Sequence, residues 1–200
     1  MSELLTFMHL GFRHITDPEG LDHILFLLAL AAIYRGRDWR DLLWVVTAFT
    51  IGHSITLVLA VTNTVRLPTP WIEFLIPLTI VVTGLENMLV AGRAPGSGRR
   101  YRPVFAGVFG LVHGAGFANY LHSLFLGSIA VPLLGFNIGI ELGQLVVLAL
   151  AGLVLAGLDR ALWALRGARP APAVLRLRVL AVSVVVVIVA TEMAVARRPW

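Results

Sequence analysis

The sequence contains no cysteine and no lysine, and only 14% of its 200 residues are charged. Without cysteine the chain can form no disulfide, and any metal site must use nitrogen and oxygen ligands. A soluble domain has about 25% charged and about 45–50% apolar residues, whereas this chain is 58% hydrophobic with a mean hydropathy of +0.87. These values exclude an ordinary soluble domain and indicate an integral membrane protein.

Two sequence signals are also missing. The N-terminal segment MSELLTFMHLGFRHI lacks the basic start and long apolar core of a cleaved signal peptide, so we expect it in the mature protein. No GxxxxGK[ST] motif occurs, which argues against direct ATP coupling within the chain. All sixteen basic residues are arginine, in short clusters between apolar runs. This distribution is typical of membrane topology signals and argues against a nucleic-acid partner.

Six apolar runs predict an all-α, polytopic membrane helical bundle in a single domain over residues 1–200. The runs cover 18–34, 39–61, 70–91, 103–125, 129–158 and 175–196. Residues 1–16 have an amphipathic pattern and predict a short interfacial helix ahead of the six-helix bundle of 17–196. Asp17 is predicted to cap the first spanning helix, and Pro18 suits its first turn.

The arginines between the runs predict the orientation. The first, third and fifth loops together carry twelve arginines, and the remaining segments carry four. Because cytoplasmic loops are enriched in Lys and Arg, we expect the arginine-rich loops in the cytoplasm and both termini outside.

Polar and ionisable residues within the predicted spans are informative, because each costs about a few kcal/mol to insert and usually faces the bundle interior. They are Asp22 and His23, preceded by His14; Thr50, His53 and Ser54; Glu73, Glu86 and Asn87; His113; and Asn137, Glu141 and Gln144. The alternating spans place Asp22, His23 and Glu73 towards the outside, His53, His113, Asn137 and Glu141 near the middle, and Glu86 and Asn87 towards the cytoplasm. This order predicts a polar ladder across the membrane.

The fifth span has two distinct faces. Asn137, Glu141 and Gln144 are spaced i, i+4, i+7 and therefore share one face, which we expect to look into a polar centre. Glycines at four-residue intervals let a neighbouring helix approach closely. These are Gly135, Gly139 and Gly143 on the opposite face of this span, and Gly110 and Gly114 around His113.

Histidines and carboxylates in a thiol-free bundle favour binding of a divalent metal, because imidazole suits Zn, Ni, Co and Cu. The predicted metal ligands are Asp22, His23, His53, His113 and Glu141. The predicted orienting or pathway residues are His14, Thr50, Ser54, Glu73, Glu86, Asn87, Asn137 and Gln144. A single buried histidine is more often a hydrogen-bonded structural group, so the prediction depends on several of them meeting.

Five motifs occur in an order similar to that of a known family. GFRHI…GLDHILFLLAL, FTIGHSITL, WIEFLIPLTIVVTGLEN, HGAGFA and FNIGIELGQ, between residues 11 and 148, resemble the HupE/UreJ family of bacterial membrane proteins. The resemblance implies a metal permease of the bacterial inner membrane, associated with nickel-dependent hydrogenase and urease systems. It selects Asp22, His23, His53, Glu86, His113 and Glu141. The segment TDPEG lengthens the spacing from His14 to Asp22, so the role of His14 stays open.

Two main functions remain open at this stage, and a structural or sensory protein with a permanently bound metal is a weaker third. The first is a permease for nickel or cobalt, and the same groups could instead relay protons. The second is an intramembrane hydrolase whose zinc activates water against a lipid substrate. A permease needs polar groups on both sides of its centre, whereas a hydrolase needs a closed site beside a lipid-accessible cavity. The expected partners are the lipid bilayer and the metal ion, and the sequence leaves a homo-oligomer open.

Overall fold

A computed structural model describes residues 2–18, 20–62, 64–65, 68–91, 101–124, 129–166 and 171–200. Seven α-helices form this part of the chain. They are α1 (Glu3–Thr16), α2 (Leu21–Ala32), α3 (Trp39–Val61), α4 (Thr69–Val90), α5 (Arg102–Leu124), α6 (Ala130–Arg166) and α7 (Ala171–Ala196), with a 3₁₀ turn, η1 (Gly36–Asp38), before α3.

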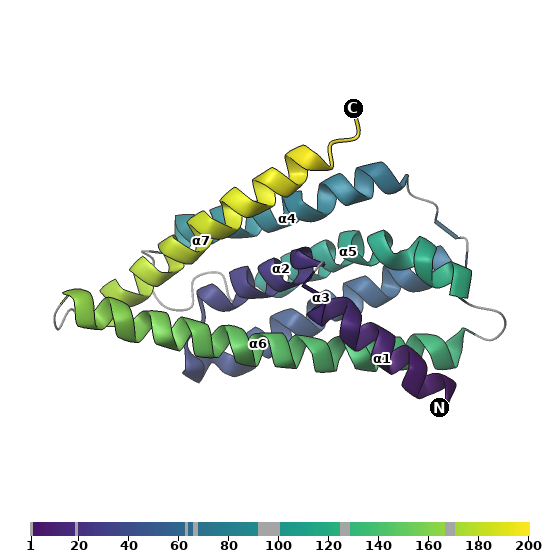
Figure 1. Cartoon of the computed structure of the whole chain (residues 1–200), viewed down its shortest axis with the longest axis horizontal. Helices are drawn as coiled ribbons and strands as arrows, with labels where there is room; N and C mark the ends of the chain where they lie inside the picture. The colour runs from purple at the N-terminus through teal and green to yellow at the C-terminus, as the bar shows by residue number, and fades with distance from the viewer. Residues whose placement is uncertain are drawn as a thin grey trace.

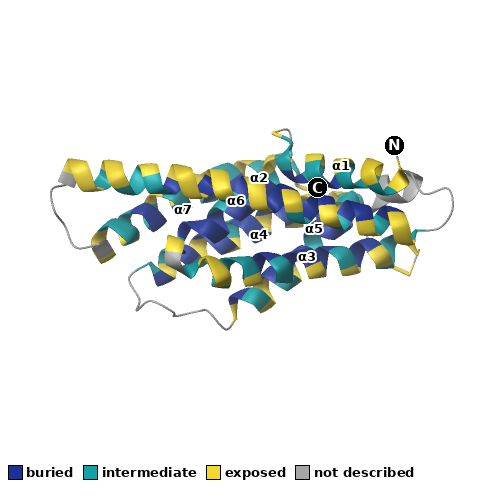
Figure 2. Cartoon of the chain, turned by 90° about the horizontal axis from the view of Figure 1, so that it is seen from below, coloured by how far each residue is buried: buried dark blue, intermediate teal, exposed yellow. Residues whose placement is uncertain are grey.

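The helices confirm a polytopic helical membrane protein. Within the described residues, α3, α4, α6 and α7 are long and apolar enough to cross a membrane, and α5 has the same length as α3, 23 residues. The predicted run 39–61 coincides with α3, and the other boundaries differ most for α6, which continues eight residues beyond position 158. Large apolar side chains such as Leu89 and Leu153 are exposed on the outward faces, while buried residues lie between the helices (Figure 2). This distribution suits a lipid environment.

Three helix pairs surround the short α2. α1 packs along α6, α3 along α5 and α4 along α7, and α2 lies between them in contact with α4, α6 and α7. Figure 1 shows α4 and α7 on one side, α1 and α6 on the other, and α2 in the middle. Most of α2 is enclosed by its neighbours: Phe26, Leu27 and Ala29 are at most 1% exposed, whereas Leu21 at its start is exposed.

Glycines set the closest helix contacts. A Cβ atom at Gly139 would overlap the carbonyl of Met8 on α1, and one at Gly135 would lie 2.5 Å from the carbonyl of Leu4. On the α3–α5 pair, Cβ atoms at Gly110 and Gly114 would overlap the carbonyls of Phe49 and His53. Gly143 similarly faces Ile15 and Phe12 of α1. The backbones therefore touch, as in small-residue packing of membrane helices.

The chain between α1 and α2 differs from the prediction. Asp17 does not cap the first spanning helix; its backbone N–H donates to the carbonyl of Arg13 and ends α1, and α2 begins after Gly20 without a side-chain cap. With 12 residues, α2 is about 18 Å long, so it cannot by itself cross an apolar layer of about 30 Å.

Arg178 of α7 holds the C-terminus of α2. Its guanidinium donates to the carbonyls of Ala32 and Tyr34, at 3.0 and 2.7 Å, and to the carboxylate of Asp159 at 2.6 Å. These bonds satisfy carbonyls that a helix end leaves without partners. We call the end of the bundle that holds Arg35, Arg102 and Arg178 the arginine-rich end.

Candidate metal centre

Four histidines from four helices meet at the centre of the bundle. His23 of α2 lies nearest to all of the others, with ring centroids 4.6 Å from His14 of α1, 5.9 Å from His53 of α3 and 5.3 Å from His113 of α5. The rings of His14 and His53 are 5.9 Å apart. His23 was expected nearer the outer surface, but its ring lies beside those of His53 and His113, because α1, packed along α6, carries the chain into the bundle before α2 begins.

Five imidazole nitrogens of this histidine cluster are buried and have no partner in the part of the chain that the structure describes. Nε2 of His14, His23 and His113 and both nitrogens of His53 have no hydrogen-bond partner among the described residues. His53 is 0% and His113 is 1% exposed. Buried polar groups in proteins are nearly always hydrogen-bonded, and each exception calls for an explanation. Five such nitrogens in one cluster suit a cationic ligand that accepts lone pairs.

Two of the imidazoles are oriented by an acceptor on the other nitrogen. Nδ1 of His23 lies 3.1 Å from the carboxylate of Asp22, and Nδ1 of His113 lies 2.9 Å from the carbonyl of Phe109. Because both acceptors require an N–H, they favour the tautomer whose Nε2 lone pair is free. This is how proteins orient histidine ligands of metals. Asp22 is held in turn by Arg197, at 3.2 Å.

Aromatic side chains enclose the histidine cluster on two sides. Phe117 and Phe136 stack on each other, with centroids 5.1 Å apart, and Phe117 also lies 4.1 Å from the ring of His14. Phe26 and Phe49 lie 5.2 and 5.1 Å from His113. These aromatic layers exclude water from the cluster and were not among the expected site residues.

The polar face of α6 bonds to α3 beside the cluster. The hydroxyl of Ser54 donates to the Asn137 side-chain carbonyl at 2.6 Å, and that of Thr50 donates to the Gln144 side-chain carbonyl at 2.9 Å. Glu141 lies between them in sequence, is half-buried, and forms no hydrogen bond or ion pair within the described residues. The structure therefore does not join Glu141 to the histidines.

A second polar cluster lies towards the arginine-rich end. Arg102 bonds to the carboxylate of Glu86 and to the Asn87 side-chain carbonyl, the latter at 2.7 Å, and Asn87 donates to the carbonyl of Ala29 at 2.7 Å. The hydroxyl of Tyr101 donates to the carboxylate of Glu86. The pKa of this hydroxyl is raised, mainly because it is partly buried and secondly because the Glu86 carboxylate is close to it. Glu73 is exposed near the start of α4.

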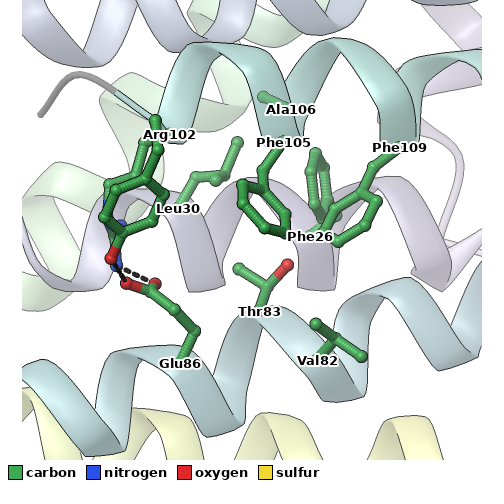
Figure 3. Close-up of a pocket in the computed structure, with 10 residues that line it drawn as sticks. Phe26, Leu30, Val82, Thr83, Glu86, Arg102, Phe105, Ala106 and Phe109 are labelled. Atoms are coloured by element: carbon green, nitrogen blue, oxygen red, sulfur yellow. Dashed lines mark hydrogen bonds and ion pairs between the residues drawn. The ribbon is translucent and has the colours of Figure 1, made fainter. Parts of the chain in front are cut away.

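The predicted ladder is interrupted. Between the two polar clusters lie Phe26 and Phe49, both at most 1% exposed. Beside them an almost wholly apolar pocket opens between α4 and α5. Figure 3 shows the Glu86–Arg102 pair at one end of this pocket and Phe26 with Phe109 at the other.

The arginines were the main functional residues that sequence reasoning missed. Arg102, Arg178 and Arg197 counted only as topology signals, yet each forms an ion pair with a carboxylate of another helix or segment. Arg178 carried one available signal, because it falls within the predicted apolar run 175–196. An ionisable residue inside a span is expected to have a partner.

The described ranges contain no group of three or more His, Asp or Glu side chains arranged to hold a metal ion. The four histidines are thus neighbours with free lone pairs, and their rings are not turned towards one common point. A small rotation about the side-chain bonds changes where Nε2 points, since the χ2 torsion of histidine is broad.

The fold and this centre define a class: a polytopic helical membrane protein with a buried histidine cluster. Residues 1–197 match the family described as HupE / UreJ protein. The chain belongs to the HupE/UreJ family. Comparison with curated proteins and with solved structures gave no match.

Proposed function

We propose that this protein is a membrane permease for a divalent transition-metal ion, with nickel or cobalt as the first candidates. The observation that carries the proposal is a set of five buried imidazole nitrogens at the centre of the bundle, none of which has a partner among the residues that the structure describes. Membership of the HupE/UreJ family, which is associated with nickel and cobalt transport, supports it. Imidazole is a suitable ligand for both ions.

The four histidines would bind the transported ion, and Asp22 would orient His23 and offset charge. His14, which we had predicted as a pathway residue, joins the ligands because its ring lies against His23. Glu141, predicted as a ligand, is left out of this set. The rings have to turn to engage one ion together, and such a site releases its ion more readily than a rigid one, as transport requires.

The route follows from the charges. With the arginine-rich end in the cytoplasm and both termini outside, an ion would arrive near Asp22 and leave past Glu86 and Asn87. The Phe26 and Phe49 layer closes the way between the two clusters, so transport requires these side chains to move. We therefore assign the present conformation to a closed state.

Uptake into proteoliposomes containing a metal-sensitive dye tests the proposal. Ni²⁺, Co²⁺, Zn²⁺ and Mn²⁺ would be compared for the wild type, His53→Ala, His113→Ala and His9→Ala. His9 is an exposed histidine on α1 and serves as the matched control. We expect uptake of Ni²⁺ or Co²⁺ that is lost in both cluster variants and kept in His9→Ala. Stoichiometric metal binding retained in both folded cluster variants would disprove the site.

A second candidate, a zinc-dependent hydrolase acting on lipids, is favoured by one observation. The apolar pocket between α4 and α5 ends at Phe26 and Phe109, and the ring of Phe26 lies 5.2 Å from His113. An acyl chain entering from the bilayer would approach the histidine cluster there. Tightly bound zinc without uptake of any ion would favour this function over transport and justify a screen of lipid substrates.

A further inference from the structure

A groove unrelated to the histidine cluster lies between α3 and the second half of α6, at the arginine-rich end. Its volume is about 450 Å³. The apolar residues that line it include Leu42 and Leu43 of α3 and Leu145, Leu148, Gly152 and Ala156 of α6. Leu43 and His53 are ten residues apart on α3, which is about 15 Å along a helix, so the groove is separate from the proposed ion site.

The groove has the length of one leaflet of a bilayer. It follows α6 from Leu145 to Asp159, which is about 21 Å at 1.5 Å per residue. One leaflet of a bilayer, with its headgroup region, is about 20–22 Å thick. A groove of this length, lined by leucines and small residues, fits one extended acyl chain with its polar end at the arginine-rich surface.

The charges at that end select the headgroup. Three charged residues line the groove, and two of them, Arg178 and Asp159, neutralise each other in an ion pair of 2.6 Å. The third, Arg35, is half-buried at the rim, and the carboxylate of Asp38, which does not line the groove, accepts its backbone N–H at 3.3 Å. Trp39 lines the same rim, 53% exposed, with the Arg40 guanidinium 5.4 Å from its ring. Exposed tryptophan and arginine at a helix end are typical of the headgroup level.

We propose that this groove binds an anionic glycerophospholipid such as phosphatidylglycerol, with the phosphate at Arg35 and one acyl chain along α6. The proposal is independent of the transport function. The net positive charge of the three charged lining residues complements the phosphodiester, and the apolar floor complements the acyl chain. Basic pockets between helices on the cytoplasmic side of membrane proteins recognise lipid headgroups in this way.

Gly152 allows the groove to be filled without disturbing the fold. A Cβ atom at Gly152 would meet no atom within 4 Å, so Gly152→Trp places an indole in the groove and overlaps nothing at its base. Gly157 is on the same helix, is equally open and does not line the groove. Gly157→Trp is therefore the matched control for helix propensity and added apolar surface.

Native mass spectrometry of the detergent-purified protein tests the proposal with phosphatidylglycerol, phosphatidylcholine and oleate as probes. We expect one phosphatidylglycerol per chain, preferred over phosphatidylcholine by about fivefold, the effect of one arginine near a membrane surface. Gly152→Trp should weaken this binding more than tenfold, and Gly157→Trp should match the wild type. Arg35→Gln should remove the preference, whereas Arg40→Gln should keep most of it.

Four outcomes would overturn the proposal. Equal binding by the two tryptophan variants would show that lipid does not occupy the groove, and equal binding of the two phospholipids to the wild type would remove the role of Arg35. A dimer that Gly152→Trp dissociates would assign the groove to a second copy of the chain. Preferred binding of oleate would identify a fatty-acid carboxylate as the ligand instead.

Discussion

At the scale of single residues, the arrangement at the centre depends on which imidazole nitrogen carries the proton. Asp22 and the carbonyl of Phe109 each engage an Nδ1 atom, so the Nε2 atoms of His23 and His113 keep their lone pairs. A cluster of neutral imidazoles is the form that binds transition metals. The sequence shows only that histidines occur in apolar runs; the acceptors that orient them become visible in the structure.

Asp22→Asn tests this orientation. The amide retains the size of the carboxylate but offers an NH₂ group as well as a carbonyl, and it lacks the charge that engages Arg197. We expect the affinity for Ni²⁺ to fall about 10- to 100-fold, as is typical when the partner of a ligating histidine is lost. Isothermal titration calorimetry in detergent would measure it, with Glu192→Gln, an exposed carboxylate on α7, as control. Equal affinities for the two variants would contradict the proposed role of Asp22.

At the scale of helices, we infer that α1 and α2 together make one crossing. Leu4 faces Gly135 and Ile15 faces Gly143, so α1 runs parallel to α6, and α6 proceeds towards the arginine-rich end where α2 also finishes. The two helices are about 21 and 18 Å long, and their break lies beside His14 and His23. Broken helices of this kind form ion sites in transporters. This inference replaces the interfacial position that we expected for residues 1–16.

The sequence predicts such elements unevenly. The run 39–61 matches α3 because a continuous apolar stretch is bounded by polar residues at both ends. The sequence around Asp17 and Pro18 predicted the start of a spanning helix, whereas the structure has a break between α1 and α2 there. Residues of these types suit both a helix start and a break between two helices. His14 and His113 are ninety-nine residues apart in the sequence, yet both approach the ring of His23. This meeting depends on how each helix is rotated about its own axis. That rotation is set by the glycine contacts, which composition and periodicity do not specify.

Gly139→Leu tests whether α1 belongs to the ion site. The backbone of α1 touches α6 at this glycine, so a leucine must push α1 away. We expect the free energy of unfolding to fall by about 1–3 kcal/mol, the usual cost of overpacking, and Ni²⁺ affinity to fall as well because His14 leaves the cluster. Gly157→Leu, at an open glycine of the same helix, should change neither. Unfolding in mixed micelles would measure the change in stability, and calorimetry would measure the Ni²⁺ affinity. A Gly139→Leu variant that is destabilised but binds Ni²⁺ normally would exclude α1 from the site.

At the scale of the whole molecule, the alternation of arginine between the two ends of the bundle predicts its orientation. Arg35, Arg102 and Arg178 gather at one end, and Arg197 lies at the other with Asp22. Because arginine-rich segments stay in the cytoplasm, Gly36 should face the cytoplasm and Thr64 the outside. Both are exposed, and a Cβ atom at Gly36 meets no atom within 4 Å, so single cysteines there should leave the fold intact.

The absence of cysteine from the chain makes the labelling test simple, because no native thiol reacts. A membrane-impermeant maleimide added to intact cells should label Thr64→Cys and spare Gly36→Cys, and both should be labelled equally once the membrane is dissolved. The reverse pattern would place the arginine-rich end outside and invert the proposed route, so that an ion would meet Glu86 and Asn87 before the histidines. Labelling of both cysteine variants in intact cells would mean that the two loops lie on the same side of the membrane. That result would contradict a single membrane crossing by α3, which connects the two loops.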